Sequence, residues 1–173
     1  MKLFFLFILL IPLHIFSTEF SVMTYNVHNL FDTNDDLKKD DKAFLPLDKK
    51  KGQVHISACK KIPVFKWREE CLNLDWNEEA KTRKIKNLVE VISSFESQGP
   101  DVIALQEVEN KIVLGELMKM LEPFGYIDSV LLEGKDYRGI DSAFISKFPI
   151  LDSKLHYVNF KISSRKRDTR PIL

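Results

Sequence analysis

The sequence lacks an excess of charge of either sign, because its 26 Lys and Arg residues nearly balance its 25 Asp and Glu residues. This balance excludes a wholesale attraction to nucleic acid or to a membrane surface, so an anionic ligand has to be bound locally. Internal repeats and low-complexity tracts are also absent. The 173 residues are enough for one domain with a hydrophobic core and leave little room for two.

Long hydrophobic runs are missing beyond the start of the chain. Residues 3–16 are almost wholly apolar, a length that is typical of a secretory leader and too short for a comfortable membrane span. We therefore expect residues 1–18 to be a signal peptide and the protein to be exported, to the periplasm or outside the cell. An uncleaved anchor is the alternative, because the residues before the cleavage point are bulky.

Cysteine is scarce, with Cys59 and Cys71 as the two cysteines of the chain. In an oxidising compartment a pair at this spacing forms a disulfide, which would stabilise the fold by about 3 kcal/mol. Two free thiols, or part of a metal site, are the alternatives. The metal site is the weaker one, since there is no CxxC pair and His55 alone does not complete a zinc signature.

Residues 33–80 read as an insertion between regular elements. Residues 32–51 mix acids and lysines with few apolar residues, which predicts a solvated loop. The paired aspartates there do not have the spacing of a calcium-binding EF-hand loop. We expect Trp67 and Trp76 to fasten the insertion to the core.

Two helices are predicted from apolar residues at helical spacing. The first follows a capping pattern at residues 75–78 and ends before Gly99-Pro100. The second spans about 111–122. The expected buried residues are Ile85, Leu88, Val89, Ile92 and Phe95 in the first helix and Ile112, Leu114, Leu117, Met118 and Leu121 in the second. Lys81 and Lys84 are among the residues expected on the solvated face.

Strands are predicted at 19–26, 101–106, 126–132, 140–146 and 155–162. The strand at 101–106 ends in Glu107, and strand ends at a sheet edge are where ligand sites gather. Glu107 otherwise merely begins a loop. Asn26, at the end of the first strand, either satisfies its own turn or directs its amide oxygen at a ligand.

Four separated segments together resemble one family. They are residues 24–32 (TYNVHNLFD), 100–108 (PDVIALQEV), 137–143 (YRGIDSA) and 169–171 (TRP). In order and spacing they are similar to the endonuclease/exonuclease/phosphatase superfamily, which includes DNase I-like nucleases, sphingomyelinases and inositol polyphosphate phosphatases. The resemblance implies an α+β fold, the DNase I-like four-layer αββα sandwich, of which residues 19–173 would form the first half with an incomplete second sheet.

The resemblance also implies a metal site. The Glu matching Glu107 binds a divalent cation in the family, usually Mg²⁺ (with Mn²⁺ or Ca²⁺ as substitutes), and the Asn matching Asn26 lies beside it. Carboxylate and amide oxygens suit such a hard cation. Arg138 matches a phosphate-contacting Arg, with a salt bridge to Asp136 or Asp141 as the competing role, and Arg170 is a weaker phosphate candidate.

The chain departs from the family pattern in one respect. The Asp-x-Asn pair and the Ser-Asp-His segment that family members use for catalysis do not occur in their expected places, and Asp32-Thr33-Asn34 lies in the wrong loop. We therefore expect a truncated chain that is inactive by itself, with the apolar inner face of its sheet left to water.

The predicted function is that of an exported, metal-dependent phosphodiesterase, preferably nuclease-like. A sphingomyelinase- or phosphatase-type substrate, and a non-catalytic remnant or secreted binding module, are the alternatives. The partner is nucleic acid or another phosphodiester, with no stable protein partner and no membrane contact beyond the leader.

Overall fold

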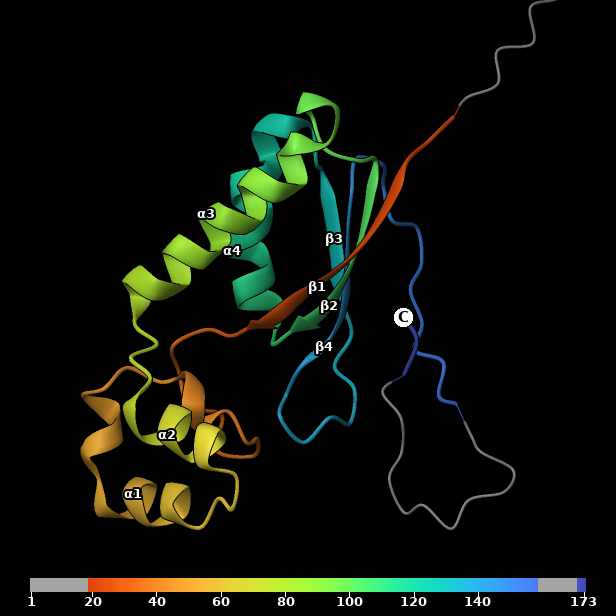
Figure 1. Cartoon of the computed structure of the whole chain (residues 1–173). Coiled ribbons are helices and arrows are strands. Elements are labelled where there is room, and N and C mark those ends of the chain that lie inside the picture. Colours follow the sequence, from red (N-terminus) through yellow and green to blue (C-terminus); the bar gives the residue numbers. More distant parts are fainter. Residues whose placement is uncertain (1–18, 159–170) are drawn as a thin grey trace, which may run out of the picture.

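The computed structural model describes residues 19–158 and 171–173. Its centre is a four-stranded sheet in the order β1-β2-β4-β3 (Figure 1). The strands are β1 (Val22–Leu30), β2 (Val102–Val108), β3 (Asp128–Leu131) and β4 (Asp141–Ser146). Strands β1 and β2 run parallel, whereas β4 is antiparallel to both β2 and β3.

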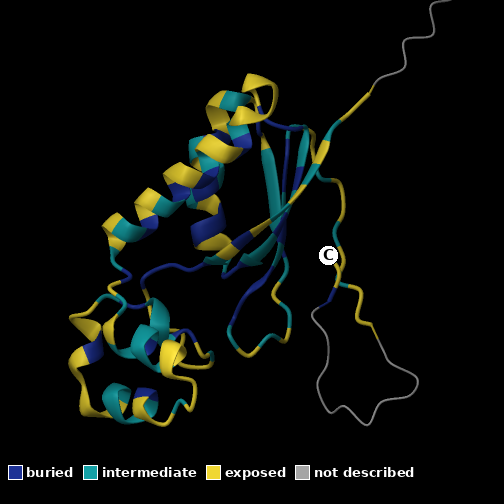
Figure 2. Cartoon of the chain, viewed as in Figure 1, coloured by how far each residue is buried: buried dark blue, intermediate teal, exposed yellow. Residues whose placement is uncertain are grey.

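Two long helices cover one face of this sheet (Figure 1). They are α3 (Glu78–Ser94) and α4 (Lys111–Leu121), and each begins at an asparagine whose side chain accepts backbone N–H groups of the first turn. Their apolar stripes pack on the strands to form the main core (Figure 2). Fully or nearly fully buried members are Ile85, Leu88, Ile92, Ile103, Leu105, Val108, Leu114, Leu117, Leu121 and Ile145.

The insertion before α3 folds into short helices beside one end of the sheet (Figure 1). It contains α1 (Gln53–Lys60) and α2 (Phe65–Asn73), preceded by 3-10 turns at Lys42–Phe44 and Lys49–Lys51. Further 3-10 turns, at Phe95–Ser97 and Glu122–Phe124, end α3 and α4. Within the part of the chain that the structure describes, no helix combines the length and apolar character that crossing a membrane requires.

The predicted fold class is confirmed, since helices pack on a mixed sheet as in half of the four-layer sandwich. Within residues 19–158 and 171–173 the structure contains one sheet. The face of this sheet opposite the helices carries Val102, Val130 and Phe144 along an open groove of about 670 Å³. Residues 150–158 run past this face (Figure 1). The predicted strand at 155–162 is wrong for 155–158, where His156 makes only an isolated bridge to Ile172, and the remainder lies outside the described residues.

Several expectations about burial were wrong. The 32–51 region is not simply solvated, because Lys50 is 3% exposed and donates to the carbonyls of Ala43, Glu70 and Leu74 at 2.8, 3.3 and 2.6 Å. The ammonium of Lys50 provides hydrogen bonds for three backbone carbonyls of the insertion. Trp76 is buried as expected, with its indole N–H donating to the Asp32 carbonyl at 2.9 Å, whereas Trp67 is 60% exposed.

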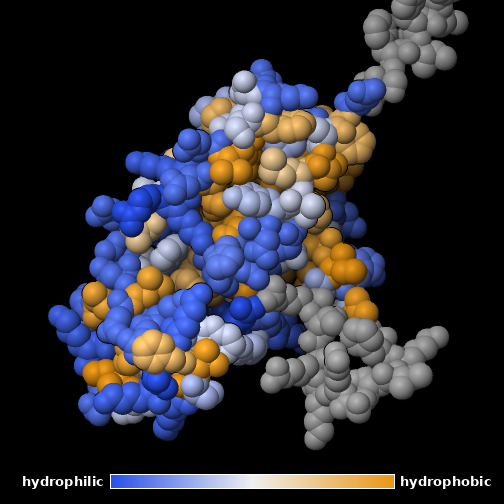
Figure 3. Space-filling view, in the orientation of Figure 1, coloured by the Kyte–Doolittle hydropathy of each residue, from blue (hydrophilic) through white to orange (hydrophobic). Residues whose placement is uncertain are grey.

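The helix faces differ from the prediction at Ile112, Phe95 and Lys81, and also at Lys84, which lies at the strand ends. Ile112 is exposed and Val113 takes its place in the core, because helical spacing from the buried Leu117 reaches positions 113 and 114 and not position 112. Phe95 is 40% exposed, since α3 has already ended at Ser94. Lys81 lies 2.7 Å from Glu116 and 3.0 Å from Glu78, and this pairing allows its burial between α3 and α4. Hydrophilic side chains predominate over α3 in the view of Figure 3, whereas hydrophobic side chains show among the hydrophilic ones around α1 and α2.

The pairing of Lys81 gives a first prediction. Replacing Glu116 with Ala leaves a buried ammonium with one fewer partner, so we expect the free energy of unfolding to fall by about 1–3 kcal/mol. Glu79→Ala removes an exposed pair with Arg83 at 3.7 Å and should cost less than about 1 kcal/mol. Denaturant unfolding of the two variants provides the measurement, and equal losses would contradict the assigned role of Lys81.

Candidate functional site

The candidate site lies where β1 and β2 end. Because the two strands are parallel, their carboxyl ends meet at one edge, and Asn26 pairs with Gln106 in the ladder. The pairing then becomes irregular and resumes at Leu30 and Val108. Strand β1 therefore begins and ends later than the predicted 19–26, because the chain continues past Asn26 through this irregular stretch.

A bulge in β2 moves Glu107 out of the core. Regular alternation after the buried Ile103 and Leu105 would direct Glu107 towards the helices. Glu107 instead has a positive φ of 69°, and both Gln106 and Glu107 are half-buried before burial resumes at Val108. A bulge is a recurrent means of re-aiming a side chain next to a functional site.

Asn26 is exposed and caps a tight turn. Its Oδ1 accepts the backbone N–H of His28 at 2.8 Å, which is the turn-forming role considered for it. The amide oxygen has a second lone pair, so this turn does not prevent it from binding a cation. His28 and Asn29 both have positive φ values, 56° and 64°, as the chain leaves the paired segment.

Lys84 lies against this edge although the sequence predicted a solvated position. Its ammonium donates to the carbonyls of His28 and Asn29 at 2.5 and 3.1 Å and lies over the Trp76 ring. Burial lowers the pKa of Lys84, and the negative charge of Glu107 acts in the opposite direction. The ammonium of Lys84 therefore supplies a positive charge close to Glu107.

Of the predicted phosphate contacts and cysteines, the structure describes Arg138 and the two cysteines but not Arg170. The Nε of Arg138 lies 3.6 Å from Oδ1 of Asp136, so of the two competing carboxylates the structure pairs it with Asp136. Arg170 lies outside the described residues, as does the predicted signal peptide, 1–18. Cys59 and Cys71 are joined by a disulfide between α1 and α2.

An acidic hollow of about 120 Å³ adjoins this edge. Asp32 and Glu109, which follow β1 and β2, meet there: the backbone N–H of Asp32 donates to Glu109 Oε2 at 2.6 Å, and the Asn110 amide donates to both carboxylates. Burial raises the pKa of Glu109 to about 8. The remaining lining residues are Asn34, Asp35, Asp36, Lys39, Glu133, Gly139 and Asp141.

Sequence reasoning missed Asp32, Glu109 and Lys84 as neighbours of the site. A signal for the two acids was present, because each directly follows the apolar end of a strand, at Phe31 and Val108. Using that signal requires the parallel pairing of the strands, which the residues alone do not reveal. For Lys84 there was no signal, since lysines fill the outer face of α3.

Comparison with known proteins places the chain in a family. A family model described as Endonuclease/Exonuclease/phosphatase family matches residues 70–172. The chain belongs to the endonuclease/exonuclease/phosphatase family. The match covers Glu107, Arg138 and Arg170 and begins after Asn26. No curated protein and no solved structure matches the chain significantly.

Membership assigns a phosphodiesterase- or nuclease-type hydrolase class and divalent-metal dependence in general terms. The residue types at the strand ends suit a hard divalent cation, because Asn26 offers an amide oxygen and Glu107, which follows its ladder partner Gln106, offers a carboxylate. The ammonium of Lys84 opposes metal binding at this edge, because its positive charge already interacts with Glu107 and repels a metal cation.

Asp41, whose Oδ2 accepts the backbone N–H of Asp36 at 2.8 Å, gives a prediction for pH dependence. This residue is 1% exposed, and its Oδ1 has no hydrogen-bond partner. Burial raises its pKa from 3.8 to about 6, although backbone N–H groups of Asp36 and Asp41 itself oppose the rise. The folded state therefore binds more protons than the unfolded state between about pH 4 and 6, and the free energy of unfolding falls as the pH rises through this range.

We expect Asp41→Asn to remove the share of this fall that comes from Asp41, at most about 3 kcal/mol, and to leave the share that comes from the raised pKa of Glu109. Denaturant unfolding at pH 4, 5, 6 and 7 measures it. Asp40→Asn is the matched control, because Asp40 is exposed and its contact with Lys42 is long, at 3.8 Å. An unchanged pH profile in Asp41→Asn would contradict the effect of burial on this carboxyl.

Proposed function

We propose that the protein is an exported, divalent-metal-dependent phosphodiesterase that acts on nucleic acid. The observation that supports it most directly is the position of Glu107 directly after Gln106, the residue that pairs with Asn26 where the parallel strands β1 and β2 end. Family membership supports the reaction class. The disulfide between Cys59 and Cys71, together with the apolar start of the sequence, supports export.

In this proposal Glu107 and Asn26 hold Mg²⁺, with Mn²⁺ and Ca²⁺ as substitutes. When bound, the ion would stabilise charge that develops on the phosphate and the leaving oxygen. Asn26 contributes a fixed amide oxygen, because the hydrogen bond from His28 holds its side chain in one orientation. The bulge at Glu107 holds the carboxylate at the strand edge instead of in the core.

Positive charge for the substrate comes from the chain's own side chains. The ammonium of Lys84 lies at the same edge, held by two carbonyls. Arg138 is half-buried and paired on one side through Nε, so the outer nitrogens of its guanidinium can bind a phosphate in the geometry that suits it. Arg170 remains a second phosphate candidate by resemblance alone.

Metal binding tests the proposal directly. We expect the chain to bind one Mn²⁺, followed by its electron paramagnetic resonance signal, and Glu107→Gln to weaken this binding at least about tenfold, since the substitution removes the charged ligand. Glu90→Gln on the exposed face of α3 is the matched control and should bind as the wild type does. Equal Mn²⁺ binding by wild type and Glu107→Gln would refute the metal site.

Cleavage of DNA with Mg²⁺, measured on the same three proteins, separates an enzyme from a binding module. Activity that needs both Mg²⁺ and Glu107 supports the phosphodiesterase. Metal binding without cleavage favours the non-catalytic alternative. Parallel assays with a sphingomyelin and an inositol polyphosphate substrate distinguish the substrate classes.

A further inference from the structure

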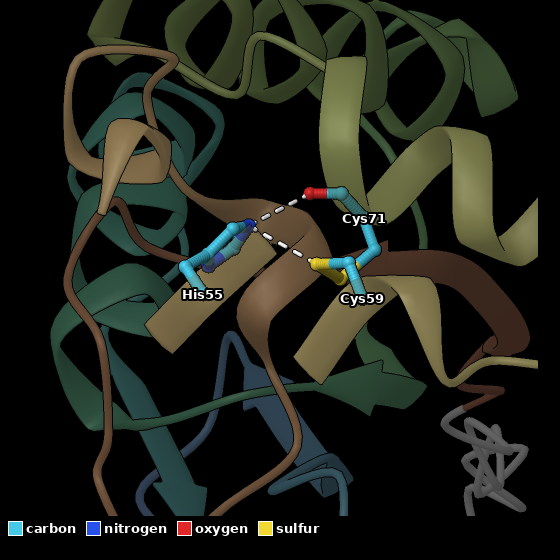
Figure 4. Close-up of side chains that lie close together, drawn as sticks. All are labelled: His55, Cys59 and Cys71. Atoms are coloured by element: carbon cyan, nitrogen blue, oxygen red, sulfur yellow. Dashed lines mark hydrogen bonds between the residues drawn. A yellow bond between two sulfur atoms is a disulfide. The ribbon is translucent and has the colours of Figure 1, made fainter. Parts of the chain in front are cut away.

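A cluster of three side chains in the insertion is separate from the strand-end site and plays no part in it. His55 and Cys59 are four residues apart on α1, so they share one face of that helix, and Cys71 faces them from α2. His55 Nε2 lies 3.2 Å from the Cys59 sulfur and 3.0 Å from the Cys71 carbonyl oxygen (Figure 4). The three possible ligand atoms lie within 4.8 Å of one another.

The two cysteines of this cluster are more deeply buried than the histidine. Cys59 and Cys71 are 0% and 2% exposed, whereas His55 is half-buried. In the disulfide form the sulfurs are poor ligands, because metals bind the thiolate. The imidazole can then donate its Nε2 hydrogen to the Cys71 carbonyl, which lies at hydrogen-bonding distance.

We propose that His55, Cys59 and Cys71 form a Zn²⁺ site when the disulfide is reduced. A dithiol reductant supplies two electrons and two protons: the S–S bond breaks, two thiols form, and the reductant becomes its own cyclic disulfide. Zinc binding then displaces the two thiol protons into solvent, and Nε2 binds the metal with its hydrogen moved to Nδ1.

The donor set and its spacing select this class of metal. Two thiolates and an imidazole are soft ligands that suit zinc and are unsuited to Mg²⁺ or Ca²⁺. Zinc–sulfur and zinc–nitrogen bonds of about 2.3 and 2.0 Å place ligand atoms on one tetrahedral ion about 3.5 to 4 Å apart. All three ligand atoms already lie within 4.8 Å of one another. After reduction the two sulfurs, bonded to each other in the disulfide, have to move apart to the spacing that the tetrahedral ion requires.

The Cα atoms of Cys59 and Cys71 lie 5.6 Å apart, so reduction does not require the helices to separate before the metal binds. Three protein ligands leave a fourth position on the half-buried side of His55, where water can bind. The same pair of helices is therefore tied together by a covalent bond in one redox state and by a metal in the other.

Zinc titration of the full chain before and after dithiol reduction tests this proposal. We expect the reduced chain to bind one Zn²⁺, measured by competition with a chromophoric chelator, and the oxidised chain to bind none at this site. Co²⁺ in place of zinc should give thiolate charge-transfer absorption. His55→Ala should weaken zinc binding by the reduced chain at least about tenfold, and His156→Ala should leave it unchanged.

The oxidised His55→Ala chain should keep the circular dichroism spectrum of the wild type, which separates loss of a ligand from loss of the fold. The proposal is overturned if the reduced wild type binds zinc no more tightly than the Cys59→Ser/Cys71→Ser double variant, or if His55→Ala binds as tightly as wild type. A reduced chain that unfolds and does not regain its spectrum with zinc overturns it as well.

Discussion

The parallel pairing of β1 with β2 is the constraint on which the rest of the structure depends. It joins segments some 80 residues apart, and a polar clamp fixes its register: the backbone and hydroxyl of Ser21 both donate to Asp101 Oδ2, at 2.8 and 2.9 Å, and the Asp101 N–H donates back to the hydroxyl at 3.0 Å. These hydrogen bonds hold the pKa of Asp101 below its usual range. A slip of one residue would turn every side chain of β1 to the other face and separate Asn26 from the Glu107 edge. The clamp at one end of the strands therefore positions the candidate site at the other.

Buried cations attach the insertion where apolar residues are too few. Burial lowers the pKa of Lys50 to about 8, yet its three carbonyl partners connect the 3-10 turns to α2. Lys84 does the same for the turn after Asn26, and the Trp76 indole holds the carbonyl of Asp32. Lys50 satisfies backbone oxygens within the insertion, whereas Lys84 and Trp76 satisfy backbone oxygens at the end of β1, so the insertion contacts the strand end through Trp76. Changes within residues 33–80 can therefore affect the strand-end site without touching its ligands.

Periodicity in the sequence was sufficient to predict α3, α4 and the four strands of the sheet, with β1 shifted in its bounds. Ile85, Leu88, Leu114 and Leu117 repeat at helical spacing and pack in the core as predicted. It failed where burial is achieved by hydrogen bonding, as at Lys50 and Lys81, because no hydropathy pattern marks a lysine that has found partners. It also failed at Trp67, which was predicted to pack against the core and is exposed. Of the two tryptophans, Trp76 is the one that packs there. The placement of Asn26 and Glu107 near the same strand ends was expected from family resemblance, whereas the register and the bulge at this edge depend on contacts between distant segments.

Backbone conformation at the strand ends gives an independent reason to assign function to this edge. Among the described residues, five non-glycine residues have positive φ, and three of them, His28, Asn29 and Glu107, lie where β1 and β2 end. Each such conformation costs on the order of 1 kcal/mol, and glycine would avoid the cost. For a turn that served only to reverse the chain, glycine would be the less strained choice. A carboxylate at the bulge, however, can only be presented by a residue that has a side chain. The strain is therefore consistent with a position where the carboxylate of Glu107 has a chemical role.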